Sequence, residues 1–186
     1  MPYIYGPRLY LRAIEVEDWE HGYRWVNDPE VTRFLPLHLF PYSQLRERGW
    51  YERAARGESR DEVHFAIVLR EGDRYIGNTS LFAIDWRHRQ AGFGIMIGEP
   101  DCWDKGYGTE AMQLVLEMAF RQLGLHKVWL QVDADNERAI QAYTKAGFRR
   151  EGVLRDDRYY NGRFHDTVIM GILSAEFVPL ERETEG

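Results

Sequence analysis

The chain has 186 residues, of which 44% are apolar and 14% aromatic, enough for one buried core, so a single domain over residues 1–186 is predicted. Its 24 Lys and Arg against 30 Asp and Glu give a formal net charge of −6, which disfavours nucleic acid and anionic membranes as partners. A single cysteine, Cys102, excludes an internal disulfide and a thiolate metal cluster, and neither a signal peptide nor a run of ~20 apolar residues is found, so a cytoplasmic protein is expected.

The first third of the chain combines a strand with two helices. Apolar residues recur at helical spacing up to Pro29, which is expected to end the first helix. Ser43 is a favoured N-cap residue for the second helix. Gly57 follows its last turn. The expected elements are a strand over 8–12, a helix over 15–28, an aromatic loop over 33–42 and a helix over 43–56.

The remainder of the chain is rich in strands. Asn161-Gly162 is the favoured pair for a type I′ hairpin turn, so the runs on either side of it are predicted to pair. The expected elements are strands over 63–69, 75–84 and 90–97, a helix over 108–124, a strand over 127–132, a helix over 136–147, strands over 148–160 and 163–173, and an acidic, partly frayed tail over 174–186. This order predicts an α/β (α+β) domain with one mixed, mostly antiparallel sheet flanked by helices.

The segment Trp103–Ala111 leaves a strand and opens a helix. Gly106 and Gly108 allow the backbone to curl so that successive N–H groups point at one place, where the helix dipole adds positive charge. This pattern indicates a phosphate site, although tight strand-to-helix turns without ligands use the same residues. Lys105 either adds a charge to that site or is simply solvated.

Several motifs in order resemble the GNAT superfamily of N-acetyltransferases, and more narrowly the branch that contains the ribosomal-protein N-terminal acetyltransferases. The resemblance extends from Leu9 to Leu173. One position departs from the superfamily pattern, because Trp103 stands where Gln or Arg is usual. The segments that carry the resemblance are Ile95-Met96-Ile97-Gly98, residues 103–111, residues 136–143, Lys145-Ala146-Gly147-Phe148 and residues 161–166.

The resemblance implies the acyl-CoA N-acyltransferase fold and direct transfer of an acetyl group from acetyl-CoA to a primary amine, on a protein N-terminus or a small molecule. It implies that the pantetheine arm lies between two splayed strands as an added strand would, and that helix-start amides hold the pyrophosphate. Asn136 is either a plain N-cap or also a contact of the arm. The cofactor-binding residues so implied are Ile95, Met96, Ile97, Asp104, Lys105, Gly106, Tyr107, Gly108, Thr109, Asn136 and Tyr143.

Attack of an amine on a thioester needs a donor for the oxyanion, an acid and a base. A backbone N–H near Ile97 suits the first role. By resemblance, the Tyr143 phenol, with a pKa near ~10, protonates the departing sulfur; otherwise it is a core aromatic of its helix. Glu99 is the catalytic base candidate, and Asp85, His88, His64 and His165 are alternatives on strand ends and turns.

Two other functional classes remain open, a catalytically silent acyl-CoA sensor and a purely structural interaction protein. No metal is expected, because no histidine pair has the i, i+4 spacing of a helical zinc site. A direct-transfer mechanism assigns no catalytic role to Cys102. The acceptor stays open, the loops expected to select it are 34–42 and 85–89, and a homodimer is a further possibility.

Overall fold

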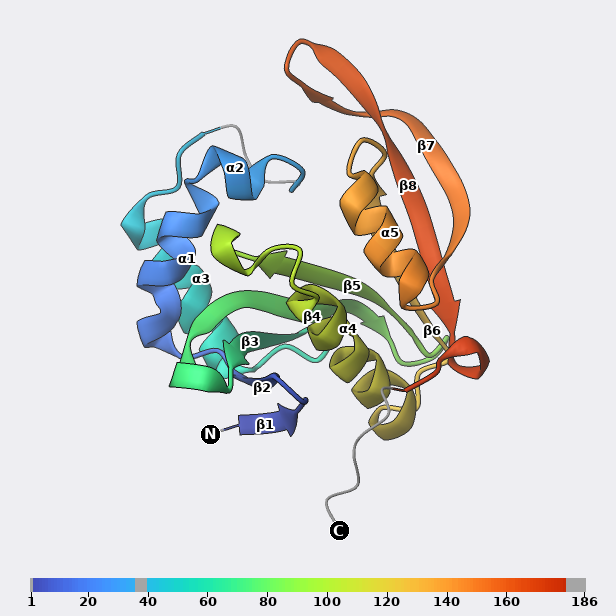
Figure 1. Cartoon of the computed structure of the whole chain (residues 1–186), viewed down its shortest axis with the longest axis horizontal. Helices are drawn as coiled ribbons and strands as arrows, with labels where there is room; N and C mark the ends of the chain where they lie inside the picture. The colour runs from blue at the N-terminus through green and yellow to red at the C-terminus, as the bar shows by residue number, and fades with distance from the viewer. Residues whose placement is uncertain (1, 36–39, 180–186) are drawn as a thin grey trace.

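The computed structural model describes residues 2–35 and 40–179 and contains one eight-stranded sheet in the order β1-β2-β3-β4-β5-β6-β8-β7 (Figure 1). The strands are β1 (Pro2–Tyr5), β2 (Leu9–Ala13), β3 (Val63–Leu69), β4 (Tyr75–Asp85), β5 (Gln90–Ile97), β6 (Lys127–Asp133), β7 (Arg149–Tyr160) and β8 (Arg163–Leu173). The helices are α1 (Trp19–Val26), α2 (Pro29–Thr32), α3 (Gln44–Arg56), α4 (Tyr107–Glu117) and α5 (Glu137–Lys145). The predicted mixed, mostly antiparallel sheet is confirmed, with β5 and β6 the one parallel pair among these strands.

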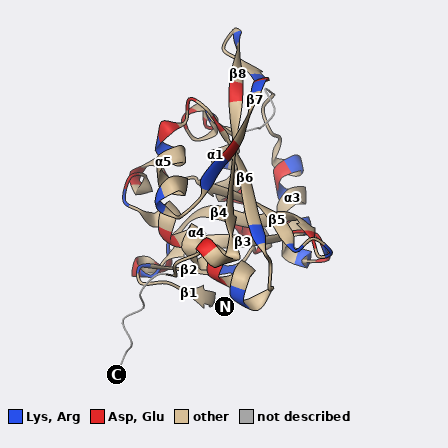
Figure 2. Cartoon of the chain, turned by 90° about the vertical axis from the view of Figure 1, so that its right-hand side faces the viewer, with Lys and Arg blue, Asp and Glu red and all other residues tan. Residues whose placement is uncertain are grey.

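Each face of the sheet has its own apolar core. Side chains alternate between the faces along a strand, and on β3 this sends Phe65 and Ile67 to the larger cluster with α4 but Ala66 and Val68 to a second cluster with α1 and α3. Figure 2 views the sheet nearly edge-on, with α5 on one side and α3 on the other, and shows acidic and basic residues interspersed over the surface. The two faces therefore offer separate approaches to the same strands.

Local capping chemistry accounts for most of the confirmed boundaries. The Ser43 side chain accepts a hydrogen bond from the Arg46 amide at the start of α3, and Asn136 accepts one from Ala139 at the start of α5. Asn161 and Gly162 both have positive φ, 50° and 77°, as a type I′ turn requires. The long β7–β8 hairpin projects beyond the rest of the sheet (Figure 1).

Three features differ from the sequence predictions. β1 was not expected and is added to the edge of the sheet by antiparallel pairing with β2. Pro29 begins α2 instead of only ending α1, with Asp28 as its N-cap, because proline fits the first turn of a helix. The helix after Gly106 ends in a π-helical turn over Met118–Gln122. Residues 36–39 of the expected loop and 180–186 of the tail lie outside the described residues.

The parallel pair β5 and β6 separates after three residues. The pairs recorded between them are Gln90 with Lys127, Ala91 with Val128 and Gly92 with Trp129. From there β6 continues beside β8 and β5 continues beside β4. The β5 segment 93–97 thus has main-chain groups on its β6 side with no strand partner in the described chain, as the splayed-strand expectation requires.

Candidate active site

The turn between β5 and α4 has the backbone conformation expected of an anion site. Asp104 and Gly106 have φ of 59° and 80°, and Gly106 is the N-cap of α4. The left-handed region is accessible to glycine without strain, which explains the residue at this point. The next amides, at Tyr107, Gly108 and Thr109, belong to the first turn of α4 and have no acceptor within the helix. They are therefore free to bind a negative group.

Buried polar contacts hold this turn in place. Glu110, 5% exposed, accepts hydrogen bonds from the amides of Arg8 and Leu9 and from Arg8 Nε at 2.7 Å. Arg8 in turn donates to the carbonyl oxygen of Lys105 at 2.8 Å. The start of α4 is therefore tied to β2, while the Lys105 side chain is exposed to solvent. Nothing in these contacts occupies the first-turn amides.

The side chain of Trp103 has a structural partner. Its indole Nε1 donates to the carbonyl oxygen of Ile97 at 2.9 Å, which ties the end of β5 to the turn. Arg138, from the first turn of α5, lies 4.8 Å from the Trp103 ring centroid and 3.7 Å from the Asp104 carboxylate. These contacts connect α5 to the phosphate-site turn across the open side of β5.

Tyr143 lies on α5 beside the open edge of β5. Its ring packs edge-on against Phe93 of β5, with centroids 6.5 Å apart, and against Phe148. Its hydroxyl makes no hydrogen bond to any described residue, and burial raises the pKa of Tyr143 to about 12. A partly buried phenol whose hydroxyl has no described protein partner has its proton available for a ligand at this edge of β5.

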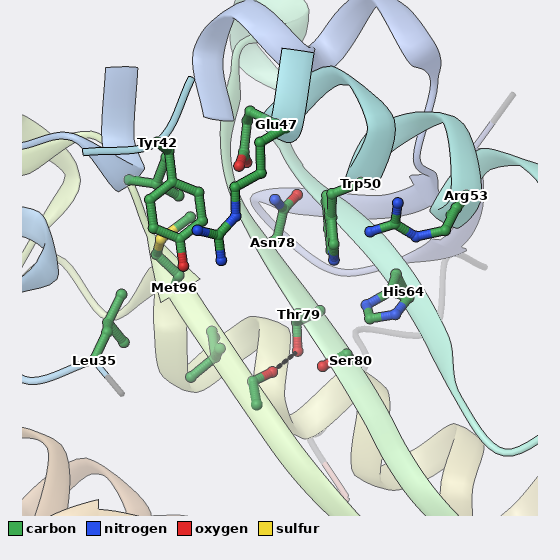
Figure 3. A pocket seen from close by; sticks show the side chains of 14 residues that line it. Leu35, Tyr42, Glu47, Trp50, Arg53, His64, Asn78, Thr79, Ser80 and Met96 are labelled. Carbon is green, nitrogen blue, oxygen red and sulfur yellow. Dashed lines mark hydrogen bonds between the residues drawn. The ribbon is translucent and has the colours of Figure 1, made fainter. Parts of the chain in front are cut away.

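A pocket of about 390 Å³ lies on the α1 and α3 face of the sheet (Figure 3). Its floor is made by β4 and β5, with Asn78 and Met96 among the floor residues, and α3 forms a wall. Asn78 is fixed by a hydrogen bond to the hydroxyl of Tyr51 at 3.0 Å and accepts one from Tyr75. Its lining residues are Val26, Leu35, Tyr42, Arg46, Glu47, Trp50, Arg53, His64, Asn78, Thr79, Ser80, Gly94, Ile95 and Met96.

This pocket and the phosphate-site turn share β5. Met96 and Ile95 both line the pocket, but the Met96 side chain packs against the cluster with α1 and α3, whereas those of Ile95 and Ile97 pack against the cluster with α4. The three residues predicted to hold the pantetheine arm, 95–97, therefore have side chains on both faces of the sheet. They lie in the part of β5 that no longer pairs with β6. A long cofactor on the α4 side and an acceptor on the α3 side would meet at this segment.

Glu99, the predicted catalytic base, is engaged in ion pairs. Its carboxylate accepts hydrogen bonds from Trp25 Nε1 at 2.9 Å, Arg24 at 3.1 Å and Arg74 at 2.8 Å. Burial alone would raise the pKa of Glu99, but the hydrogen bonds from Trp25 and Arg74 and the two arginine charges outweigh it and lower that pKa. A carboxylate held in this way is a poor proton acceptor, so these contacts favour a structural role for Glu99, and its catalytic role stays a prediction.

The other base candidates are scattered. Asp85 and His88 pair with each other at 2.7 Å on an exposed turn at the far end of β5, and no residue of the 85–89 loop lines the described pocket. His165 is buried between Asp135 and the carbonyl of Tyr160. His64 does line the pocket, and burial lowers its pKa against the opposing effect of Glu62.

A cluster of metal-ligand side chains and the single cysteine lie outside the pocket. Asp133, Asp135 and His165 have ligand atoms within 4.8 Å of one another, but Tyr160 donates to Asp133 and Arg163 pairs with Asp135 at 2.7 Å. Protein partners thus already use these carboxylates. Cys102 is 3% exposed, and burial followed by the charge of Asp101 raises its pKa, which leaves it a poor nucleophile.

Sequence reasoning missed Glu47. It is 5% exposed in the pocket wall, yet it lies in a helix whose polar composition is typical of a solvated surface. The signal that the sequence does offer is the pair of aromatic residues that begins with Trp50, about one helical turn after Glu47, because it indicates that this side of the helix is buried.

Comparison with known proteins agrees with this geometry. The family model described as "Acetyltransferase (GNAT) domain" matches residues 8–149. Spermidine N(1)-acetyltransferase of Escherichia coli (strain K12) is 32% identical, over 95% of this chain and 91% of the relative. An uncharacterized N-acetyltransferase p20 of Bacillus licheniformis is 29% identical, over 95% of this chain and 99% of the relative.

Among solved structures, spermidine N-acetyltransferase from Vibrio cholerae in complex with CoA and spermine superimposes with a TM-score of 0.83 at 27% identity, covering 92% of this chain and 98% of that chain. These relatives do not support the narrower resemblance to the ribosomal-protein branch. No helix in the described residues combines the length and apolar character needed to cross a bilayer. The chain belongs to the GNAT acetyltransferase family and is an acetyl-CoA-dependent N-acetyltransferase.

Proposed function

We propose that this enzyme transfers the acetyl group of acetyl-CoA directly to the primary amine of a small molecule in a ternary complex. The single observation that carries the proposal is the arrangement around β5. Its unpaired segment borders the phosphate-site turn on one side and a pocket of about 390 Å³ on the other. Two substrates that approach from opposite faces can be bound at the same time, as direct transfer requires.

The residues of the cofactor half have distinct tasks in this proposal. Acetyl-CoA supplies a thioester whose acetyl carbon is the electrophile. The first-turn amides at Tyr107, Gly108 and Thr109 bind its diphosphate, and the main chain of residues 95–97 aligns the pantetheine arm. A backbone N–H near Ile97 stabilises the oxyanion. Asn136 caps α5 and so fixes the helix that presents Tyr143.

Tyr143 donates the proton that the departing sulfur needs. Its hydroxyl has no described protein partner, and burial raises its pKa to about 12, so it is fully protonated at neutral pH and ready to act as an acid. A small acceptor is favoured over a protein N-terminus because the pocket is bounded by α3, β3 and the residues flanking the 36–39 segment. The spermidine acetyltransferases among the relatives also act on a small amine by name.

The experiment is an acceptor screen that reads released CoA, run on the wild type and on Tyr143→Phe. Removal of the acid should lower kcat by about 10²- to 10⁴-fold, while the melting temperature changes little because the hydroxyl makes no protein hydrogen bond. Binding of acetyl-CoA, measured by calorimetry, should be retained in both proteins. Tight cofactor binding with no turnover of any amine would instead support the silent-sensor alternative.

Thermal shift provides the test against a purely structural protein. Acetyl-CoA at about 100 times its dissociation constant should stabilise the fold by about 2.7 kcal/mol. In a domain of this size that corresponds to a rise in melting temperature of several degrees. No shift at any accessible concentration would contradict the proposed function as a whole.

A further inference from the structure

The pocket contains one carboxylate that the transfer scheme leaves unexplained. Glu47 on α3 is 5% exposed; its backbone N–H donates to the carbonyl oxygen of Ser43, but its carboxylate has no hydrogen-bond or ion-pair partner among the described residues. Other buried carboxylates of this chain are paired, as Glu110 is with Arg8 and Asp18 with Arg12, both at 2.7 Å. Figure 3 shows Glu47 extending from α3 among the side chains that line the pocket.

A largely buried carboxylate without a protein partner is unfavourable when it is charged. Burial raises the pKa of Glu47, and the neighbouring charge of Arg46 offsets this only in part. An ammonium group that entered the pocket would supply the missing partner and restore a favourable charge pair. The site is therefore matched to a cation, which the acceptor amine carries before it reacts.

Two arginines line the same pocket. Arg46 precedes Glu47 on α3 and lies over the Tyr42 ring at 3.9 Å from its centroid. Arg53 follows six residues later, about 9 Å along the helix axis, and makes no ion pair with a described residue. Both arginines are exposed residues that line the pocket. The lining thus offers one largely buried carboxylate and two guanidinium groups, while His64, whose pKa burial lowers, adds no charge at neutral pH.

We infer that the acceptor is an amine that also carries an acidic group, such as an amino acid, with its ammonium at Glu47 and its acidic group at Arg53. The inference rests on the proposed function and names the substrate class of that site. A guanidinium recognises a carboxylate or phosphate through paired hydrogen bonds. A polyamine brings several ammonium groups into a lining with more arginines than carboxylates, so like charges oppose its binding.

Glu47 also completes the proton balance of the transfer. The amine nitrogen forms a bond to the acetyl carbon as the carbon–sulfur bond breaks, and the bonding pair leaves with sulfur. The acceptor ammonium gives up two protons in all. Glu47 accepts the first before the attack, and the second replaces, by way of solvent, the proton that Tyr143 gives to sulfur.

The test uses acceptor pairs that differ only by a carboxylate: lysine against cadaverine, and 6-aminohexanoate against pentylamine, with spermidine alongside. The readout is kcat/KM from released CoA. The wild type should favour each acid over its partner at least tenfold. Arg53→Gln should remove most of that preference, whereas Arg48→Gln, a change on the same helix at a residue that does not line the pocket, should leave it intact.

Glu47→Gln should lower kcat/KM for every acceptor, flatten the acidic limb of the pH profile and leave acetyl-CoA affinity unchanged. Equal or better turnover of cadaverine or spermidine, or a preference that survives Arg53→Gln, would overturn the inference while the acetyltransferase function stood. If no amine in the panel were acetylated by a protein that binds acetyl-CoA, the proposed function and the inference would both fall.

Discussion

Replacement of Gly108 by alanine separates what the fold requires from what the cofactor requires. Gly108 is the second residue of α4 and its φ is not positive. A Cβ at this position would lie 3.7 Å from Ile97 Cγ1 and 3.9 Å from Ile95 Cδ1, which are ordinary contacts. The protein therefore has room for a methyl group. Alanine is favoured over glycine in a helix by about 0.5–1 kcal/mol, so Gly108→Ala should be slightly more stable, by ~2–4 °C in melting temperature at most.

The same methyl group should weaken the cofactor complex. It would occupy the space above the first-turn amides, beside the two isoleucines that border the open edge of β5. If those amides bind the diphosphate, its oxygens must approach the backbone to about 2.9 Å, which the methyl group prevents. We expect at least a tenfold loss of acetyl-CoA affinity, or about 1.4 kcal/mol.

The assay is titration calorimetry with acetyl-CoA together with thermal unfolding. Gly49→Ala is the matched control, since Gly49 lies inside α3 and its added Cβ would meet only Arg53 at 3.7 Å. It should raise stability by a similar amount and leave the affinity unchanged. The reasoning is refuted if Gly108→Ala binds acetyl-CoA as tightly as the wild type, because the turn would then not be the diphosphate site.

Three further substitutions test the charged groups. Glu99→Gln should lower the free energy of unfolding by about 1–2 kcal/mol at pH 7. Because the pKa of Glu99 is lowered in the folded state, the wild type loses this advantage as its carboxylate is protonated. The difference in unfolding free energy between the two proteins should therefore shrink as the pH falls below about 4. Glu110→Ala removes the carboxylate that accepts hydrogen bonds from Arg8. It should lower the free energy of unfolding, measured with urea, by about 2–3 kcal/mol. Glu47 has a raised folded pKa, so the wild type should lose stability relative to Glu47→Gln as the pH rises above about 4.5; equal melting profiles would contradict this.

The elements that could be predicted from the sequence are those specified by short-range chemistry. Caps at Ser43 and Asn136 and the Asn161-Gly162 turn depend on side chains within a few residues, and all three lie where they were expected. β1 was missed because its four residues carry no periodicity of their own and are fixed by pairing with β2. That pairing is a tertiary contact, which a pattern search along the chain does not register.

The ion-pair partners of the candidate base Glu99 could not be predicted from the sequence for a similar reason. Glu99 is neutralised by Arg24, which is 75 residues away, and by Arg74, which is 25 residues away. Conversely, Glu47 lies in a helix with arginines on both sides of it, so its sequence environment indicates a solvated surface. It is nonetheless 5% exposed, on a helix that packs against α1. The long-range contacts that decide whether a carboxylate is paired are therefore not visible in the sequence.

The two halves of the proposed active site, the cofactor half and the acceptor half, are specified by different features of the sequence. The cofactor half depends on main-chain groups at Gly106 and along β5, so a glycine pattern of a few residues is sufficient to specify it. The acceptor half is assembled from side chains of α3, β3, β4 and β5 that are far apart in the sequence. Any one of these side chains can change without disturbing the cofactor half. Proteins that share a fold commonly differ in binding specificity in this way. An identity of 32% to a spermidine acetyltransferase therefore supports the acetyl donor more strongly than the acceptor, and the charges at Glu47 and Arg53 are the better guide to the latter.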